Sequence, residues 1–282
     1  MLCTAKEVLK AAREKCYAVP GFNCVADVMI RGILDRAERC RAPVFLMLYV
    51  AEIDDKTWWY YPTTIRTVAS RYTIPIVMHL DHATDIDVIR ASLDNGFTSV
   101  MYDGSNLPFD ENVKMTRKVV ELAAPYGASV EAELGLVGGF DLANNCVANI
   151  LTQPSEVETF VERTGVDLLA VSIGTAHGVY QQMPQLDIAL LKELNAASKV
   201  PLVLHGGSGT PDDQMRDAIA NGICKFNVYT DLRIAMWNRF KQIATEIKSN
   251  APLPDEYIKL LQETIGDLVE EKATLAGAVG RC

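Results

Sequence analysis

The sequence predicts a (β/α)8 TIM barrel over residues 1–282, a single domain with extra terminal helices. Eight short apolar segments alternate with longer segments of helical period, the pattern of repeated βα units. The apolar segments are continuous runs, as expected for parallel strands buried on both faces, and each unit spans roughly 25 to 35 residues. No Gly- or Ser-rich linker divides the chain, and a composition that is 49% apolar suffices for one large core.

The predicted elements follow in order along the chain. An amphipathic helix comes first, with Thr4 as its cap. Eight strands are predicted, at 18–23, 43–50, 75–80, 99–104, 129–134, 168–173, 201–206 and 225–230. Between them, apolar residues recur every three and four positions and predict crossover helices, for example at 27–41, 111–127 and 156–165. Helices continue through 230–282, with a break at Pro252 and Pro254.

The composition argues against several classes of protein. A net charge of -9 with scattered basic residues disfavours nucleic-acid binding, which needs a concentrated positive patch. The N-terminus lacks the apolar core of a signal peptide, and no apolar run is long enough to span a membrane. Seven cysteines without a C-x-x-C pair indicate reduced thiols, so we expect a cytoplasmic protein.

All four histidines lie at the C-terminal ends of three apolar runs, 75–83, 168–178 and 201–210. Parallel barrels place their chemistry at this end of the strands. Imidazole binds zinc well, and three ligands leave a position open for substrate. The alternative, unrelated structural hydrogen bonds, is common for one histidine but not for three in one register. The sequence therefore predicts one metal site at the mouth of the barrel.

Five further segments carry a resemblance to a known family: HLDHA (79–83), VEAELG (130–135), IGTAHGVY (173–180), LHGGSG (204–209) and KFNVYTDL (225–232). With the opening AVPGFN, they resemble the class II, zinc-dependent fructose- and tagatose-bisphosphate aldolases essentially from end to end. The resemblance implies one catalytic Zn²⁺, with a monovalent cation as a further candidate. It also implies reversible cleavage of a ketose 1,6-bisphosphate to dihydroxyacetone phosphate and an aldehyde. A homodimer or homotetramer is the default for such enzymes.

His82, His177 and His205 end the third, sixth and seventh predicted strands and are the expected zinc ligands. The metal would act as a Lewis acid for the enediolate that forms when the bond beside the carbonyl breaks. His79 precedes His82 by three positions in one strand, so the two side chains are predicted to point to opposite faces. We therefore expect a structural role for His79.

Asp81 is the first catalytic candidate. It alternates with His82 and is predicted to project near the metal on another face. The resemblance implies that it donates and accepts the proton at the hydroxyl that becomes the aldehyde, a task that suits a carboxyl group tuned by burial and by a nearby cation. The alternative is a carboxylate that only orients a histidine.

Phosphate is expected at the ends of strands seven and eight, where barrel enzymes commonly bind it. The glycine-rich turn after His205, with the helix that begins near Pro211, offers backbone N–H groups and a positive helix end, although such a turn alone is usually only a turn. Asn227 would lie near the substrate carbonyl and Thr230 on the phosphate, while Gly178 contributes a backbone donor. The expected substrate-binding residues are Gly178, Gly206, Gly207, Ser208, Asn227, Val228, Tyr229 and Thr230.

Asp103 and Glu133 also end strands. The matching positions of the family serve an alternative, non-catalytic metal position, so both are secondary candidates for metal binding. Glu131 and Glu133 point the same way along one strand, so one could be a ligand and the other its support. Alternatively, they are barrel-interior carboxylates bonded to neighbours.

The loop at 135–155 is the expected lid, and it departs from the family. The family commonly has a glutamate after its two glycines, thought to abstract the proton from dihydroxyacetone phosphate. Here Phe140 and Asp141 follow, and Asp141 is the second catalytic candidate, with a side chain one methylene shorter.

Two other stretches are unlike the family. Met47-Leu48-Tyr49 stands where members usually carry a stretch like Gln-Val-Ser, and Tyr49 would narrow or reshape the aldehyde side of the pocket. The aromatic stretch 57–61 could line a different aldehyde pocket or a subunit contact. Because every residue expected to hold zinc and dihydroxyacetone phosphate is present, the ketone half of the substrate is predicted to be kept while the aldehyde half can differ.

Three functions are open at this point. The first is an active zinc aldolase. The second is a non-catalytic phosphosugar-binding paralogue that has lost its lid-loop base, although Asp81 and His82 would not be needed merely to bind phosphate. The third is a zinc hydrolase on the same barrel, which the lack of an H-x-H sequence after strand one disfavours.

Overall fold

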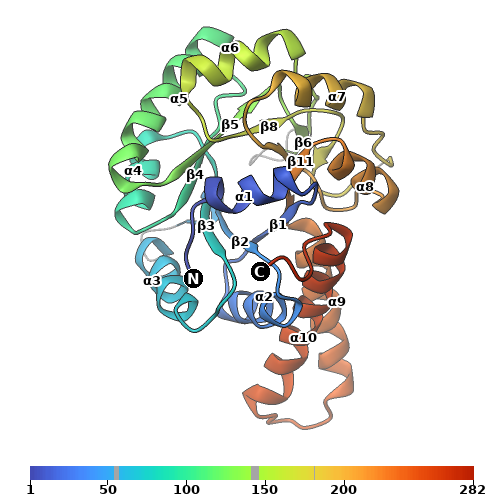
Figure 1. Cartoon of the computed structure of the whole chain (residues 1–282). Helices are drawn as coiled ribbons and strands as arrows, with labels where there is room; N and C mark the ends of the chain where they lie inside the picture. Colours follow the sequence, from blue (N-terminus) through green and yellow to red (C-terminus); the bar gives the residue numbers. More distant parts are fainter. Residues whose placement is uncertain (54–56, 141–145, 181) are drawn as a thin grey trace.

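The computed structural model, which describes residues 1–53, 57–140, 146–180 and 182–282, contains a closed barrel of eight strands (Figure 1). Each barrel strand pairs in parallel with its neighbour, in the order β1-β11-β10-β8-β5-β4-β3-β2. The predicted fold class is confirmed. The barrel strands are β1 (Val19–Asn23), β2 (Val44–Tyr49), β3 (Ile76–Ala83), β4 (Ser99–Tyr102), β5 (Ser129–Leu134), β8 (Leu168–Val171), β10 (Leu202–Leu204) and β11 (Ile223–Val228).

Helices surround the barrel (Figure 1), and those predicted at 27–41, 111–127 and 156–165 are α2, α5 and α6. None of the helices in the described residues combines the length and apolar character needed to cross a membrane. The helices are α1 (Ala5–Glu14), α2 (Asp27–Cys40), α3 (Thr57–Ala69), α4 (Ile86–Asp94), α5 (Phe109–Ala123), α6 (Pro154–Thr164), α7 (Ile188–Ala197), α8 (Asp212–Ala220), α9 (Thr230–Glu246) and α10 (Pro254–Leu275), with short 3-10 turns η1 (Val50–Glu52) and η2 (Ala124–Tyr126).

Helix α1 crosses the N-terminal end of the barrel strands (Figure 1). Thr4 caps this helix, as predicted: its side chain accepts from the backbone N–H of Glu7, whose carboxylate accepts from the N–H of Thr4. The backbone N–H of Lys6 donates to Ser129 at the start of β5. The opposite, C-terminal end of the strands is left as the mouth.

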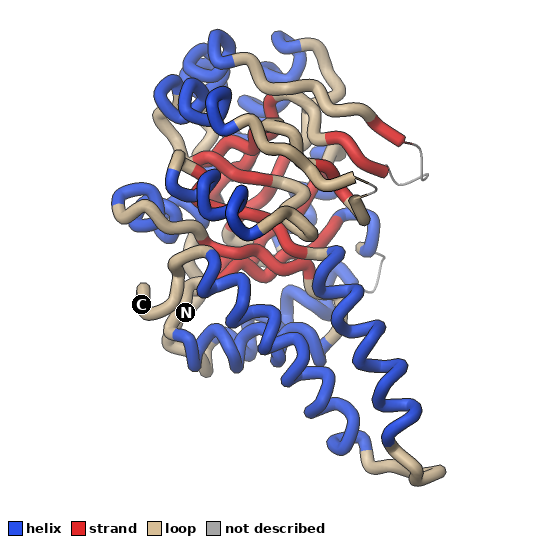
Figure 2. Tube along the Cα trace, turned by 90° about the vertical axis from the view of Figure 1, so that its right-hand side faces the viewer, coloured by secondary structure: helices blue, strands red, loops and turns tan. Residues whose placement is uncertain are grey.

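Helices α9 and α10 form a hairpin that projects away from the barrel (Figure 2). The predicted break between them is confirmed, since α9 ends at Glu246 and α10 begins at Pro254. The base of α10 packs on α2, where a Cβ on Gly32 would lie 3.0 Å from the Cβ of Ile265. Arg36 of α2 adds ion pairs to two carboxylates of α10.

A second, three-stranded sheet stands beside the mouth, so the loop expected at 135–155 is partly strand. In this sheet β6 pairs antiparallel with β7 and parallel with β9. At Gly139, with φ 125°, a Cβ would lie 2.4 Å from the carbonyl oxygen of His177, so only glycine permits this approach. His177 thus lies on β9, beyond the barrel strand whose end was predicted to carry it. The strands are β6 (Gly138–Phe140), β7 (Cys146–Val147) and β9 (Ala176–His177).

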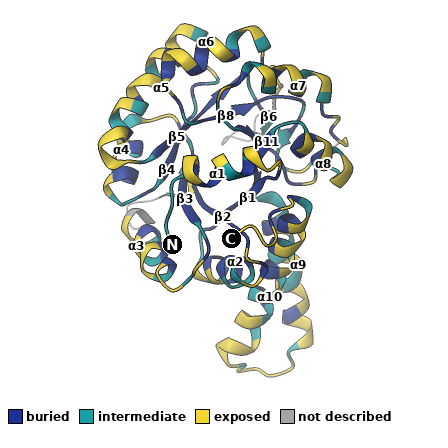
Figure 3. Cartoon of the chain, in the orientation of Figure 1, coloured by how far each residue is buried: buried dark blue, intermediate teal, exposed yellow. Residues whose placement is uncertain are grey.

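The barrel strands are buried and the outward faces of the helices are exposed (Figure 3). Burial on both faces explains why the strands are continuous apolar runs. Four acidic or basic side chains of the described residues are nevertheless fully buried in and above the barrel interior: His79, Glu131, His205 and Lys225. Burying such groups is costly unless they find partners, so their contacts bear on function.

Candidate metal centre and active site

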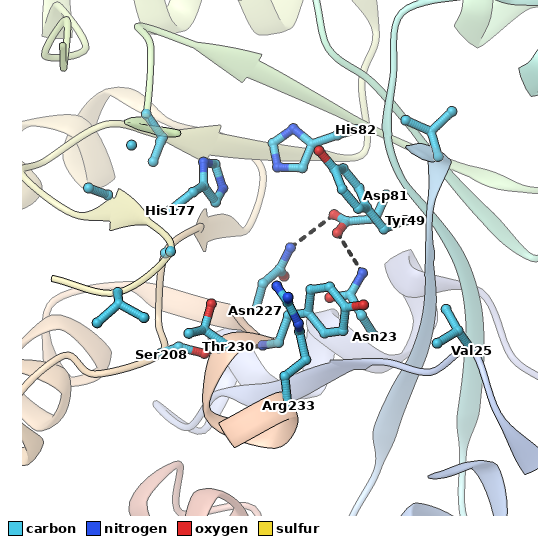
Figure 4. A pocket seen from close by; sticks show the side chains of 18 of the residues that line it. Asn23, Val25, Tyr49, Asp81, His82, His177, Ser208, Asn227, Thr230 and Arg233 are labelled. Atoms are coloured by element: carbon cyan, nitrogen blue, oxygen red, sulfur yellow. Dashed lines mark hydrogen bonds between the residues drawn. The ribbon is translucent and has the colours of Figure 1, made fainter. Parts of the chain in front are cut away.

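A cavity of about 1210 Å³ opens at the C-terminal ends of the barrel strands, with α9 along one side (Figure 4). His205, Gly207 and Val228 are buried and are not among its lining residues, and Asp141 falls outside the described residues. The other predicted site residues line it. They are Asp81, His82, Asp103, Glu133, His177, Gly178, Gly206, Ser208, Asn227, Tyr229 and Thr230.

A β-bulge near the end of β3 places Asp81 and His82. The pairing of β3 with β4 shifts between Leu80 and Ala83, so two residues of β3 oppose one of β4. His82 has φ 56°, in the left-handed region that few residues other than glycine adopt and that occurs at functional sites. Both side chains therefore reach the same cavity. Simple alternation along the strand predicted that Asp81 and His82 project on different faces. That prediction was wrong, because the bulge interrupts the alternation.

Three histidines converge on one point of the cavity. One ring nitrogen of each lies within 4.8 Å of the other two. The closest approach joins His205 Nδ1 and His82 Nε2, at 2.7 Å. The ring centroid of His177 lies 4.9 Å from that of His82, and both rings face the cavity (Figure 4). Two facing imidazole nitrogens need a proton or a cation between them, so this arrangement suits a metal ion.

The surroundings of the three rings also fit zinc. His177 Nε2 is buried and has no hydrogen-bond partner within the described residues, and a cation would supply one. His205 Nε2 lies 2.7 Å from a carboxylate oxygen of Glu131, and His82 Nδ1 lies 2.9 Å from one of Asp103. Carboxylates in these positions are typical partners of metal-binding histidines, which they orient.

His82 differs from the other two histidines of the cluster in the direction of its pKa shift. Burial lowers the pKa of His82, but the charge of Asp81 and the hydrogen bond to Asp103 outweigh it and raise the pKa to about 10. Burial and the charge of His82 lower the pKa of His177 to about 4, and they hold the pKa of His205 well below its usual range. A divalent ion would have to displace the proton on His82, so metal binding should release protons.

His82 belongs to a second cluster with Asp103 and Glu133, whose ligand atoms lie within 4.8 Å of one another. Burial, followed by the charge of Asp103, raises the pKa of Glu133 to about 8. Glu133 Oε1 accepts from the N–H of Val137 at 3.0 Å, while its Oε2 is buried without a partner in the described chain. The structure thus brings the two secondary metal candidates together, whereas Glu131 faces His205.

His79 lies apart from both clusters. Its side chain is fully buried, its Nδ1 lies 2.8 Å from the hydroxyl of Ser99, and its ring packs edge-on against Phe45 with centroids 5.9 Å apart. These contacts agree with the structural role expected for it.

Two amides hold Asp81. The Nδ2 groups of Asn23 and Asn227 donate to its two carboxylate oxygens at 2.9 and 3.0 Å (Figure 4). The carboxylate is only 4% exposed and is fixed at the wall of the cavity. Asn227 was predicted to lie near the substrate, but Asn23 was missed. Its signal was its place as the last residue of the AVPGFN segment, at the C-terminal end of β1.

The glycine-rich turn meets the start of α9. The hydroxyl of Ser208 accepts from the N–H groups of Tyr229 and Asp231, at 3.1 Å each. The turn therefore adjoins the N-terminus of α9 as well as that of α8, the helix that was predicted. At Gly206, with φ 67°, a Cβ would lie 2.5 Å from the carbonyl oxygen of Ala176. Such a concave backbone at a positive helix end favours an anion.

The outer wall of the cavity is different. Tyr49 lines it beside His82, with ring centroids 6.3 Å apart. Arg233 of α9 reaches into it, with its guanidinium carbon 5.2 Å from the centroid of the Tyr229 ring (Figure 4). Arg233 is the only lysine or arginine among the described lining residues. It was missed, although it directly follows the last motif, 225–232.

The aromatic stretch 57–61 does not line the cavity where it is described. Trp59 and Tyr60 are exposed, and the hydroxyl of Tyr60 donates to Asp27 at 2.7 Å. Of the two uses predicted for this stretch, an aldehyde pocket is therefore not supported, and a subunit contact stays a prediction.

Comparisons with known proteins agree with this site. The family model of class-II fructose-bisphosphate aldolases matches residues 3–281. A D-tagatose-1,6-bisphosphate aldolase subunit, GatY of Klebsiella oxytoca, is 37% identical over 282 residues, with 99% of each chain covered. The structure of the YdjI aldolase of Escherichia coli K12 is similar with a TM-score of 0.88 and 31% identity, covering 100% of this chain and 99% of that one. A fructose-bisphosphate aldolase of Campylobacter jejuni shares the fold at 20% identity, with a TM-score of 0.85 and coverage of 100% and 97%. The chain belongs to the class II fructose-bisphosphate aldolase family and is an aldolase of that class.

Proposed function

We propose that this aldolase reversibly cleaves tagatose or fructose 1,6-bisphosphate, or a related ketose 1-phosphate, to dihydroxyacetone phosphate and an aldehyde. The observation that carries the proposal is that a three-histidine cluster, two of whose rings line the cavity, lies beside a fixed carboxylate and an anion cradle of the same cavity. The printed name of the Klebsiella relative favours tagatose 1,6-bisphosphate as the first substrate to test.

His82, His177 and His205 would hold one Zn²⁺ ion, with Asp103 and Glu133 offering an alternative position beside His82. When bound, the ion would supply Lewis-acid chemistry, polarising the substrate carbonyl and stabilising negative charge that develops next to it. Imidazole also binds cobalt and iron, so the metal that the protein contains has to be identified by metal analysis.

Asp81 would accept the proton of the hydroxyl that becomes the aldehyde during cleavage and return it during synthesis. The amides of Asn23 and Asn227 support this role because they hold the carboxylate in one orientation at the wall of the cavity. Both oxygens of Asp81 bond to amides in the described structure, whereas a carboxylate that only orients a histidine would bond to that histidine.

The dihydroxyacetone phosphate half would lie between the histidines and the start of α9. The backbone N–H groups of Gly178 and Gly206, with the side chains of Ser208 and Thr230, would bind its phosphate. Gly207 and Val228 are buried outside the lining, so each would take part only through its backbone. The N–H of Tyr229 donates to Ser208, and its ring supports the guanidinium of Arg233. The Nδ2 atom of Asn227 lies 3.5 Å from Nδ1 of His205, so this amide would lie near the carbonyl of the substrate.

Asp141 is proposed as the base that removes the proton from dihydroxyacetone phosphate, although it lies outside the described residues. In the sequence it directly follows β6, whose Gly139 pairs with His177, a proposed metal ligand. At the outer wall, Arg233 is proposed to bind an anionic group on the aldehyde half, and Tyr49 to limit its size.

A homodimer or homotetramer in the cytoplasm is also proposed. Ile234, Trp237 and Phe240 of α9 are 45%, 64% and 53% exposed, and large apolar side chains exposed in one patch are typical of a contact surface. Light scattering would give the number of subunits. The cytoplasmic location follows from the expectation of reduced cysteines.

The experiment that tests the function is cleavage of a substrate panel by zinc-loaded protein, coupled to detection of dihydroxyacetone phosphate. The panel contains tagatose 1,6-bisphosphate, fructose 1,6-bisphosphate and several ketose 1-phosphates, each with and without a chelator. Chelator-sensitive release from one substrate would establish the reaction and name the aldehyde. No release from any of them, with zinc bound, would overturn the proposal.

A further inference from the structure

A lysine lies deep in the barrel beneath the histidines. Lys225 of β11 is fully buried, and its Nζ lies 3.0 Å from Oε2 of Glu131 on β5, which is equally buried. A buried ion pair gains little stability over apolar residues of the same size, because both ions lose their hydration. This pair therefore calls for a role other than stability.

The pair continues directly to a predicted metal ligand. Glu131 Oε1, the oxygen that Lys225 leaves free, lies 2.7 Å from His205 Nε2. A carboxylate only accepts hydrogen bonds, so this contact places the His205 proton on Nε2. Nδ1 then carries the lone pair, and Nδ1 is the atom that lies 2.7 Å from His82 Nε2 in the histidine cluster.

The remaining neighbours leave Lys225 as the group that fixes Glu131. The ring of Phe45 lies 5.4 Å from the Lys225 ammonium, which closes that side with an aromatic face. The other titratable neighbour of Glu131 is His79, whose Nε2 is 3.7 Å from Oε2, beyond hydrogen-bond distance, and has no partner in the described chain. Lys225 therefore holds Oε2 of Glu131, which leaves Oε1 of Glu131 to accept from His205.

We propose that Lys225 is a positioning residue for the metal centre: by holding Glu131, it fixes the tautomer of His205 so that Nδ1 faces the metal. The inference rests on the proposed metal ligands. Lys225 thus joins Asp103 and Glu131 as a residue that supports the proposed ligands without binding the metal. It lies on β11, the strand that also carries Asn227 of the substrate site.

The sharpest test uses Glu131→Gln with and without Lys225→Met. In Glu131→Gln alone, the lysine ammonium can bond only to the amide oxygen of the new side chain, which turns the amide NH₂ towards His205. That donor would force the lone pair onto Nε2 and the proton onto Nδ1. Adding Lys225→Met frees the amide oxygen to accept from Nε2 again, so removing the lysine should rescue the site.

Two readouts are independent of catalysis. The first is the ¹⁵N spectrum of histidine-labelled, metal-free protein, which reports the tautomer of each ring and is simple because the chain has four histidines. The second is Zn²⁺ affinity measured by competition with a chelator. We expect Glu131→Gln to shift the His205 proton to Nδ1 and to weaken zinc binding on the order of 10- to 100-fold. The double variant should restore the Nε2 proton and most of the affinity.

Lys272→Met is the matched control, because Lys272 is also a buried lysine, 7% exposed, that pairs with Asp231 and Glu271. It should lower stability without changing zinc affinity. The proposal is overturned if adding Lys225→Met to Glu131→Gln leaves the affinity and the tautomer of the single variant unchanged. If the single variant does not fold, Lys225→Met alone decides: zinc affinity equal to that of the wild-type protein contradicts the proposal. Since the tautomer is read without metal or substrate, failure of the proposed reaction would be seen separately in the substrate panel.

Discussion

The two sides of the cavity are built differently. The side with Asp81 and His82 is fixed by hydrogen bonds of about 3 Å or less between side chains at the ends of barrel strands. The side formed by α9 presents the exposed side chains of Ile234 and Trp237. It also carries Arg233, the one arginine or lysine among the described lining residues. Rigid strand ends suit the chemistry, whereas a wall on a projecting helix suits the choice of substrate. The difference suggests that reaction and specificity can be changed independently.

The largest effect should come from the fixed side. Asp81→Asn keeps the shape of the side chain but removes the carboxylate that would exchange the proton, so kcat should fall by on the order of 10²- to 10⁴-fold. Zinc content should not change, because Asp81 is not one of the proposed ligands. Asp167→Asn is the control: it removes a carboxylate at the other end of the barrel, where it accepts from the N–H of Val130. Comparable loss in both variants would show that Asp81 acts through structure alone.

On the outer wall, Arg233→Ala should lower kcat/KM for a bisphosphate by roughly 10- to 100-fold, because a charge-assisted hydrogen bond is lost. Exchange of a proton on the hydroxymethyl carbon of dihydroxyacetone phosphate, which needs only the ketone half, should be unchanged. Arg239→Ala, on the same helix and paired with Glu246, is the matched control. If Arg233→Ala slows proton exchange as much as cleavage, the two sides of the cavity are not separable.

The charge at the histidine cluster predicts a pH dependence for metal-free protein. The pKa of His82 is raised from 6.5 to about 10, so between these pH values the folded state binds more protons than the unfolded state. The contribution of His82 to the free energy of unfolding is therefore fully present below pH 6.5 and is lost as the pH rises towards 10. Urea unfolding across this range should show the decline in wild-type protein. A decline just as steep in His82→Gln would refute the assignment.

The smallest effect should come from the end of the barrel opposite the site. Thr4→Ala removes the cap of α1 and should cost about 1 kcal/mol of unfolding free energy. Because α1 lies across the far end of the strands, kcat and zinc affinity should be unchanged. Thermal unfolding and steady-state kinetics on one preparation would check both, and a fall in kcat would mean that the two ends are coupled.

The fold could be predicted because its signals are local. Burial on both faces makes each barrel strand a continuous apolar run, and strand ends such as His82 and His205 mark the mouth. The small sheet of β6, β7 and β9 could not be predicted, because strands of two or three residues have no periodicity.

The site was predictable where a residue type suits only one kind of chemistry, as for the histidines. The bulge at Asp81 and His82 could not be foreseen, because pairing between strands decides it. Asn23, Lys225 and Arg233 were missed for a related reason. An asparagine, a strand lysine and a helix arginine are ordinary at those positions, and only the closed barrel brings them to the cavity or beneath it.

The most direct test of the account is a zinc titration of metal-free protein in which bound metal and aldol cleavage are followed together. Activity should rise in proportion to bound zinc and saturate at one ion per chain, and His177→Ala should abolish both zinc binding and activity. Full activity in protein that retains no divalent metal, or zinc bound at one ion per chain in His177→Ala with normal activity, would contradict it.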